Sequence, residues 1–312
     1  MNENSYDVVI VGGGPAGLSG ALALARSRRS VLVIDAGEPR NAPAAHAHNY
    51  LGREGVPPRE LLAIGRDEVA SYGGEIVQGT VTSVERAGRG FRVEPAGGSP
   101  VEARRLLVTT GLVDELPDVP GLAERWGKDV LHCPYCHGWE VRDQAIGVLA
   151  TGPMAVHQVK LFRQLSDDVT LFVHTAPAPS QDERELLGRR GVKIVEGEVA
   201  GVEVQDDRLT GVRLASGEVV PRQALVVSPR FTARSGLLAS LGLKPVDMEV
   251  NGHVVASHIP SEMGGVTEIP GVYVAGNVTD PMAQVIGSAS AGLMAGARIN
   301  ADLVEEDFAD AR

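Results

Sequence analysis

The sequence has 312 residues, of which 22% are charged and 43% hydrophobic, and its formal net charge is −11. This length suggests about two domains of ordinary globular composition. The negative charge disfavours nucleic acid as a partner, because phosphate binding needs a basic face. No apolar stretch approaches the roughly 18 residues of a membrane-spanning helix. The polar first residues do not resemble a signal peptide, so we expect a cytoplasmic protein with no membrane partner.

The first elements predict a βαβ unit. Residues 8–11 are a short apolar run typical of a buried strand, and a helix of small and apolar residues is expected at 18–25. A second strand at 31–34 ends at Asp35. A helix is predicted at 57–72, with proline at its start and glycine after its end. Further strands are predicted at 81–84, 91–93 and 106–109.

A second βαβ pattern follows a proline-containing linker predicted at 116–120. The remaining elements are expected in this order: a strand at 146–150, a helix at 153–164, a strand at 169–173, more strands up to 227, a return linker at 244–246, a strand at 272–275 and a helix at 283–301. Alternation of this kind predicts the α/β class with two nucleotide-binding modules.

Gly12, Gly14 and Gly17 match G-x-G-x-x-G between the first strand and the first helix. In a dinucleotide-binding loop these glycines allow a tight turn, close approach of a pyrophosphate and close packing of the helix on the strand. The helix N-terminus attracts phosphate, and Asp35 stands where a carboxylate binds a ribose hydroxyl. The alternative is an ordinary tight turn, but the correct order of strand, helix and acid favours nucleotide binding.

Cys133 and Cys136 are the only cysteines, and His132 and His137 flank them. One interpretation is a redox dithiol, whose thiolate is the nucleophile. A second is c-type haem attachment through Cys-x-x-Cys-His, which requires export. A third is a zinc site, which usually needs four ligands. A fourth is a pair of buried, inert thiols. The redox dithiol is favoured, and we expect no metal site.

His137 directly follows the second cysteine. Imidazole titrates near neutral pH, so His137 is a candidate acid–base catalyst that takes a proton from a thiol. The alternative is a solvated residue beside a turn. His46 and His48 are expected in a loop near the flavin or substrate entrance.

Five segments together resemble the low-molecular-weight thioredoxin reductase family over nearly the whole chain. They are the first FAD motif at 12–17, Asn-Tyr-Leu-Gly at 49–52, Thr-Thr-Gly at 109–111, the redox motif at 133–136 and the second FAD motif at 271–278. The resemblance implies two Rossmann-like domains of the three-layer ββα type. An FAD-binding domain is expected at 1–116 and 245–312, with an inserted NADPH-domain-like module at 117–244. It also implies a homodimer.

The resemblance implies roles for individual residues. Cys136 would face the flavin and Cys133 would exchange with substrate, with His137 where reductases carry Asp. Asn277 also stands where the family usually has Asp, and its amide can still hydrogen-bond a flavin hydroxyl. The implied FAD-binding residues are Gly12, Gly14, Pro15, Ala16, Gly17, Asp35, Arg40, Asn49, Val81, Gly111, Gly276, Asn277 and Gln284.

The expected NADPH site departs most from the family. Residues 150–155 read Ala-Thr-Gly-Pro-Met-Ala, so the first glycine of G-x-G-x-x-A is lost. Residues 172–176 read Phe-Val-His-Thr-Ala, without the arginines that would hold a 2′-phosphate. FAD is therefore the expected cofactor, and NADPH is disfavoured.

These departures resemble the branch of dithiol oxidases in gliotoxin, holomycin and romidepsin biosynthesis. The branch implies disulfide formation in a small-molecule dithiol, with oxygen as the electron acceptor. An alternative is a reductase for a thioredoxin-like protein, fed by NAD(P)H or a donor such as ferredoxin. A third is a flavoprotein scaffold with an idle central module.

Overall fold

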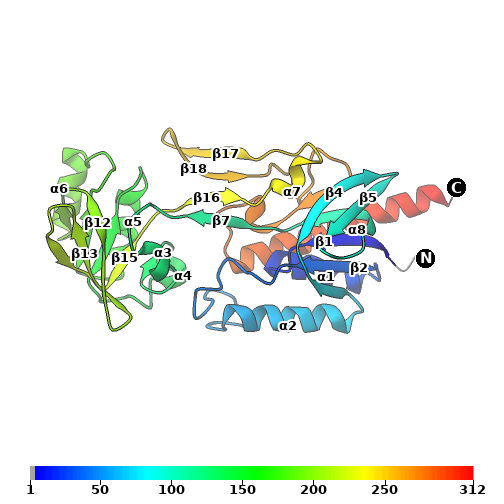
Figure 1. Cartoon of the computed structure of the whole chain (residues 1–312), viewed down its shortest axis with the longest axis horizontal. Coiled ribbons are helices and arrows are strands. Elements are labelled where there is room, and N and C mark those ends of the chain that lie inside the picture. Colours follow the sequence, from blue (N-terminus) through cyan, green and yellow to red (C-terminus); the bar gives the residue numbers. More distant parts are fainter. Residues whose placement is uncertain (1–3, 312) are drawn as a thin grey trace.

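The computed structural model describes residues 4–311 as two α/β bodies joined end to end by a pair of connecting strands (Figure 1). Both chain termini lie at the end of the larger body that is remote from the smaller one (Figure 1). Residues 1–3 and 312 lie outside the described range. The ends of the expected FAD-binding segments and part of the N-terminus expected to lack a signal peptide fall on them. No helix within 4–311 has the length and apolarity to span a membrane.

The larger body is built on a mixed seven-stranded sheet. Its path is β3-β2-β1-β6-β5-β4, and β19 also pairs with β6. Strands β1, β2, β3, β6 and β19 run parallel where they pair, whereas β4 and β5 are antiparallel to their neighbours. The bounds are Ser5–Val11, Val31–Asp35, Glu75–Gln78, Val81–Ala87, Gly90–Pro95, Val101–Val108 and Val272–Val274 for β1 to β6 and β19.

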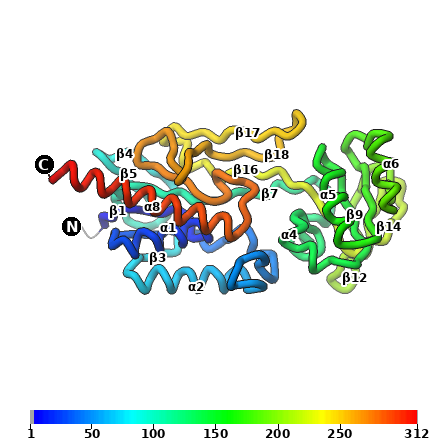
Figure 2. Tube along the Cα trace, turned by 180° about the vertical axis from the view of Figure 1, so that it is seen from behind, coloured from blue at the N-terminus to red at the C-terminus, as the bar shows by residue number. Residues whose placement is uncertain are grey.

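Three long helices pack on the larger body: α1 (Pro15–Arg26), α2 (Pro58–Ser71) and α8 (Val285–Asp310). Helices α1 and α8 pack closely because glycines face each other at the contact. A Cβ on Gly292 would clash with the carbonyl oxygen of Ala16, and one on Gly296 would lie 2.8 Å from that of Gly20. Figure 2 shows α8 lying along the outside of the body.

The smaller body contains a parallel five-stranded sheet of order β11-β10-β9-β15-β8 and an antiparallel sheet of β12, β13 and β14. Strands β8 to β15 span Val130–Leu131, Ile146–Leu149, Val169–Phe172, Lys193–Val195, Val199–Gln205, Arg208–Leu214, Val219–Pro221 and Ala224–Val226. Helices α3 to α6 span Leu122–Arg125, Pro134–His137, Ala155–Phe162 and Gln181–Arg189.

A four-stranded sheet of order β17-β18-β16-β7 lies where the bodies meet. Its strands β7, β16, β17 and β18 span Leu112–Glu115, Arg230–Ala233, Val246–Val250 and His253–His258. The short helices α7 and η1 span Gly236–Ala239 and Gly276–Val278. Strands β7 and β16 pair with each other and connect the two bodies (Figure 1).

The predicted α/β class with two Rossmann-like domains is confirmed. The helix predicted at 18–25 begins earlier, at Pro15, because proline suits a first helical turn. The last helix continues well beyond 301, to Asp310. The linker predicted at 244–246 overlaps the start of β17 at Val246. The β17–β18 hairpin was not predicted.

The expected domain limits stay a prediction, and we propose one refinement of them. Ala233, Leu238 and Leu243 are buried in the same core as strands of the larger body. A side chain that is buried in a core belongs to the unit that this core stabilises. We therefore propose that the chain returns to the larger body between Val226 and Arg230.

An ion-pair cluster fastens α8 to the sheet. The buried Arg105 pairs with Asp302 and Glu306, each at 2.6 Å. Burial alone would raise the pKa of both carboxyl groups, but hydrogen bonds from Arg105 and its neighbours outweigh it and lower both pKa values.

Arg105→Leu is expected to lower the free energy of unfolding by about 2–3 kcal/mol at pH 7, since two carboxylates lose a buried partner but stay partly solvated. Because lowered carboxyl pKa values stabilise the fold only above the unfolded values near 4, the difference from wild type should shrink as the pH falls below about 4. Denaturation with urea at several pH values measures this. Arg89→Leu, which removes an exposed pair with Asp310, is the control and should leave the free energy of unfolding nearly unchanged. Equal losses in both variants would contradict the prediction.

Candidate active site

One large cavity, of about 1480 Å³, lies between the two bodies. It is lined by the first glycine loop and by η1 of the larger body, and by α4 and the β9–α5 loop of the smaller body. It also exceeds the roughly 300–1,000 Å³ of a typical small-molecule site. The cavity therefore offers room for a cofactor together with a second ligand.

The first glycine loop has the geometry that a dinucleotide requires. Gly12 has a φ of 107°, and a Cβ there would lie 2.6 Å from the carbonyl oxygen of Thr109. A Cβ on Gly17 would clash with the carbonyl oxygen of Gly12. At Gly14, by contrast, a Cβ would meet no protein atom within 4 Å, and this residue lines the cavity. The open approach at Gly14 is where a pyrophosphate would fit.

Asp35 and the start of α1 complete this cradle. The N–H of Gly13 donates to Oδ1 of Asp35 at 2.9 Å, while Oδ2 has no hydrogen bond to any described residue. Helix α1 has no side-chain cap and no acidic residue in its first turn, so its free N–H groups remain available to an anion. The residues present fit FAD on these observations.

The predicted FAD-binding residues fall into two groups. Most of them line the cavity: Gly12, Gly14, Pro15, Ala16, Asp35, Arg40, Val81, Gly111, Gly276, Asn277 and Gln284. Gly17 lies beneath the loop instead, against Gly12. Asn49 is not among the lining residues, because its amide donates to the carbonyl oxygen of Tyr135 at 2.6 Å. The contacts of all these residues with FAD stay predictions.

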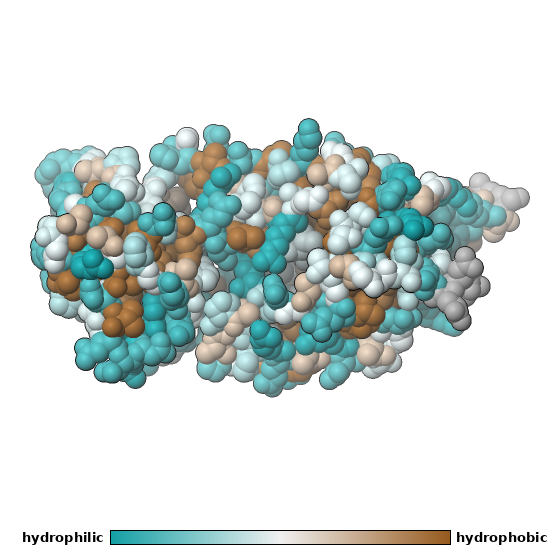
Figure 3. Space-filling model, viewed as in Figure 1, coloured by the Kyte–Doolittle hydropathy of each residue, from teal (hydrophilic) through white to brown (hydrophobic). Residues whose placement is uncertain are grey.

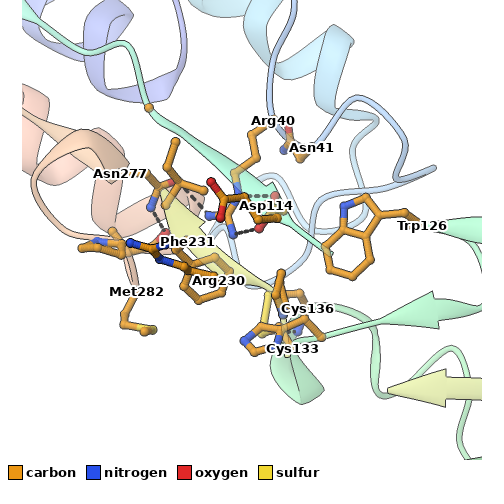
Figure 4. A pocket seen from close by; sticks show the side chains of 18 of the residues that line it. Arg40, Asn41, Asp114, Trp126, Cys133, Cys136, Arg230, Phe231, Asn277 and Met282 are labelled. Atoms are coloured by element: carbon orange, nitrogen blue, oxygen red, sulfur yellow. Dashed lines mark hydrogen bonds and ion pairs between the residues drawn. A yellow bond between two sulfur atoms is a disulfide. The ribbon is translucent and has the colours of Figure 1, made fainter. Parts of the chain in front are cut away.

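Arg40 is held by Asn277, which the sequence indicated, and by Asp114 and Phe231, which it did not. It makes a bidentate pair with Asp114, at 2.6 and 2.8 Å, and donates to Oδ1 of Asn277 at 3.2 Å. Its guanidinium lies 4.9 Å from the ring centre of Phe231 (Figure 4). The amide nitrogen of Asn277 donates to the carbonyl oxygens of Asp280 and Ala283. A carboxylate at 277 would face those oxygens, which explains the amide at this position.

Cys133 and Cys136 form a disulfide that lines the cavity (Figure 4). Cys133 caps α4, and its Sγ accepts the N–H of Cys136 at 3.2 Å. Such a hydrogen bond stabilises a thiolate at Cys133 after the disulfide opens. Among residues 4–311 no group of three or more His, Cys, Asp and Glu side chains is placed to hold a metal.

The histidines around the motif differ in their surroundings. Burial lowers the pKa of His137, so its imidazole is neutral at neutral pH, and its Nε2 is enclosed without a partner among the described residues. His48 lies between two carboxylates, with Nδ1 2.6 Å from Glu54 and Nε2 3.3 Å from Glu140. Both His46 and His48 line the cavity, in the loop where they were expected.

The second nucleotide-like loop lacks the features of the first. Ala150, which is buried in the core of the smaller body, stands where the first loop has Gly12. Gly152 resembles Gly14, since a Cβ there would meet no atom within 4 Å. Nδ1 of His174 accepts the N–H of Val199 at 3.0 Å, and burial lowers the pKa of its imidazole. His174 is therefore a neutral structural residue and not a cation for a phosphate.

Comparison with known proteins identifies the family. The family model described as pyridine nucleotide-disulphide oxidoreductase matches residues 6–296. The chain belongs to this family. It is 32% identical to thioredoxin reductase tcpT of Claviceps purpurea (strain 20.1), over 97% of this chain and 96% of that protein.

Two solved structures are also similar. The crystal structure of HlmI has 47% identity and a TM-score of 0.91, covering 100% of this chain and 96% of that one. An oxidoreductase from Agrobacterium tumefaciens has 34% identity and a TM-score of 0.89, covering 96% and 99%. The predicted thioredoxin reductase-like family is thereby confirmed: the protein is a flavin-dependent oxidoreductase that acts on sulfur groups, and its family binds FAD.

Proposed function

We propose that this protein is an FAD-dependent dithiol oxidase that closes a disulfide within a small molecule and passes the electrons to oxygen. One observation carries the proposal: the disulfide opens into the same cavity as an intact FAD cradle, whereas the second nucleotide-like loop has Ala150 in place of the first glycine and has only the neutral His174 after β10. FAD, when bound, supplies a two-electron acceptor for the cysteine pair.

The cysteine pair can carry out the oxidation of a substrate dithiol in two exchange steps. A substrate thiolate attacks Sγ of Cys133 and breaks its bond to Cys136, which gives a mixed disulfide. The second substrate thiolate then attacks the substrate sulfur and releases Cys133, so that two electrons have moved from the substrate to the cysteine pair. We further propose that His137, which is neutral and directly follows Cys136 in the chain, takes a proton from a thiol of the reaction or returns one.

Anaerobic stopped-flow mixing of the holoenzyme with dithiothreitol, NADPH and NADH in parallel tests the proposal. The dithiol is expected to bleach the flavin absorbance at least about 10-fold faster than either nicotinamide, because only the dithiol meets a complete site. Admission of oxygen should then restore the colour and yield hydrogen peroxide. No bleaching by any dithiol would refute the proposal.

A reductase acting on a thioredoxin-like protein is the second candidate, since relatives such as the one from Claviceps purpurea are named thioredoxin reductases. Rapid bleaching by NADPH or NADH in the same experiment would favour it. Bleaching only by a reduced ferredoxin would favour the reductase with that donor.

The exposed face of α8 supports a further part of the proposal, a homodimer. Ile286, Leu293 and Met294 are 41%, 50% and 50% exposed and recur at helical spacing, and Met263 nearby is 89% exposed. An apolar stripe of this kind on the outside of a body commonly marks an interface. The face in Figure 3 is, by contrast, mostly hydrophilic with separate apolar patches.

Leu293→Glu is expected to convert the dimer into monomers, because a two-fold interface buries each substitution twice and a charge there loses its water. Sedimentation velocity at micromolar concentration measures the change. Leu186→Glu, at a leucine 44% exposed on α6, should leave the dimer intact. A monomeric wild-type protein would contradict this part of the proposal.

A further inference from the structure

His132 stands immediately after β8 and directly before Cys133, and its tautomer is fixed by its surroundings. Its Nδ1 lies 3.0 Å from the carbonyl oxygen of Val227. A carbonyl oxygen can only accept, so Nδ1 carries the proton. The amide nitrogen of Gln158 is placed 3.1 Å from the same Nδ1, and its oxygen lies 3.0 Å from Oγ of Ser228. The two ends of an amide are assigned from their partners, and because Nδ1 is a donor we assign the turned amide, whose oxygen accepts from Nδ1 and whose nitrogen donates to Ser228. Nε2 is then the basic nitrogen of His132.

Nε2 of His132 is open to the cavity. It has no hydrogen bond to any described residue and is not an enclosed atom, and His132 lines the cavity together with Cys133. The ring is held edge-on to Phe231, with 5.2 Å between ring centres. His137 differs, because its Nε2 is enclosed.

The protonation state of His132 suits a base. Burial lowers its pKa most, and the bond to Val227 raises it less. The charged groups that act on it are Arg40, which lowers the pKa, and Asp114, which raises it. These two form a bidentate pair and largely cancel. The imidazole is consequently neutral at neutral pH and free to accept a proton at Nε2.

We propose that His132 is a catalytic residue of the dithiol oxidase, a base that takes the proton of the second substrate thiol. The inference rests on the proposed function and deepens it. Nε2 accepts the S–H proton, and the resulting thiolate attacks the substrate sulfur of the mixed disulfide. The bond from that sulfur to Cys133 breaks, and the leaving thiolate of Cys133 takes the proton from Nε2. This step releases Cys133 as a thiol and returns His132 to its neutral form. Together the two exchanges oxidise the two substrate sulfurs by two electrons and reduce the cysteine pair by two electrons.

His132→Gln tests the proposal, with anaerobic flavin bleaching by dithiothreitol measured between pH 6.5 and 10. The variant is expected to bleach about 100-fold more slowly than wild type at pH 7, the usual contribution of a base. The loss should shrink to within about 3-fold at pH 10, where the thiols are already ionised. A loss that does not change with pH would show a structural role and overturn the inference. His253→Gln, at another histidine that lines the cavity, is the control.

Nitrogen-15 NMR of the wild-type imidazoles gives a readout that needs no variant of His132 to fold. A neutral ring protonated at Nδ1 is expected at pH 7, and an imidazolium or a ring protonated at Nε2 would overturn the inference. The outcomes also separate the two proposals. Equal bleaching of wild type and variant removes only the role of His132, whereas a wild type that no dithiol bleaches removes the proposed function itself.

Discussion

Cys136→Ser is expected to keep the fold and the bound flavin but to slow flavin bleaching by dithiols at least about 1,000-fold. Serine is nearly the same size as cysteine, and Cys136 is only half-buried, so packing changes little. A hydroxyl cannot form a disulfide, however, and exchange with a substrate thiolate needs a sulfur–sulfur bond to break. Removing one sulfur therefore removes the whole path from the substrate.

Cys133→Ser should be equally inactive, and the two variants differ in what they trap. Cys136→Ser leaves Cys133, which lines the cavity and accepts the Cys136 N–H in the wild type, free to hold a mixed disulfide with an aromatic disulfide reagent. Mass spectrometry measures that adduct, and bleaching is measured by stopped flow. If either serine variant kept more than a tenth of the wild-type rate, the cysteine pair would be idle and the scaffold hypothesis would gain support.

The FAD cradle, which consists of the first glycine loop and Asp35, can be predicted from local sequence. A short apolar strand that leads into Gly12, Gly14 and Gly17 predicts a tight turn followed by a helix. The structure has this turn, and α1 follows it. Asp35 lies at the end of the next parallel strand, so it reaches the same edge of the sheet. Neighbouring parallel strands bring their carboxyl ends together, which makes such residues predictable.

The contacts between the bodies do not follow from local sequence. Arg40 contacts Asp114 and Asn277 only because β7, β16 and η1 converge around it. His132 gains its role from Val227, 95 positions away. No periodicity in the sequence reports pairings of this range, which explains why Asp114, Phe231 and Gln158 were missed. Asn49 was assigned to flavin from its motif, and this contact stays a prediction; in the structure its amide donates to the carbonyl oxygen of Tyr135.

Comparison of the two glycine loops shows how loss of one nucleotide site can leave the fold intact. In the first loop, Gly12 and Gly17 leave no space for a side chain, so the protein itself requires them. In the second, Ala150 stands at the position of Gly12 and is buried in the core of the smaller body, whereas Gly152 has open space around it, as Gly14 has. Packing there is satisfied without a ligand, so substitutions that weaken NADPH binding cost little stability.

Gly14→Ala is expected to raise the Kd of FAD about 10- to 100-fold without lowering the stability of the FAD-free protein. Its Cβ meets no protein atom, so the fold tolerates the methyl group, but the group projects where a pyrophosphate must approach. Overpacking of this kind costs about 1–3 kcal/mol, which corresponds to that range of Kd. Flavin absorbance per protein chain and thermal melting of the FAD-free protein measure the two quantities.

Gly152→Ala is the matched control for this prediction, because it adds the same methyl group to the equivalent loop of the smaller body, also in open space. It should leave FAD content and dithiol-driven bleaching unchanged. Gly17→Ala provides the opposite comparison, since its Cβ would clash with the backbone of Gly12 and should destabilise the FAD-free protein as well. If Gly14→Ala bound FAD as tightly as wild type while Gly152→Ala lost it, the cofactor would occupy the smaller body. The assignment of the two loops would then be reversed. The proposed path of electrons from the disulfide to the flavin would be reversed as well.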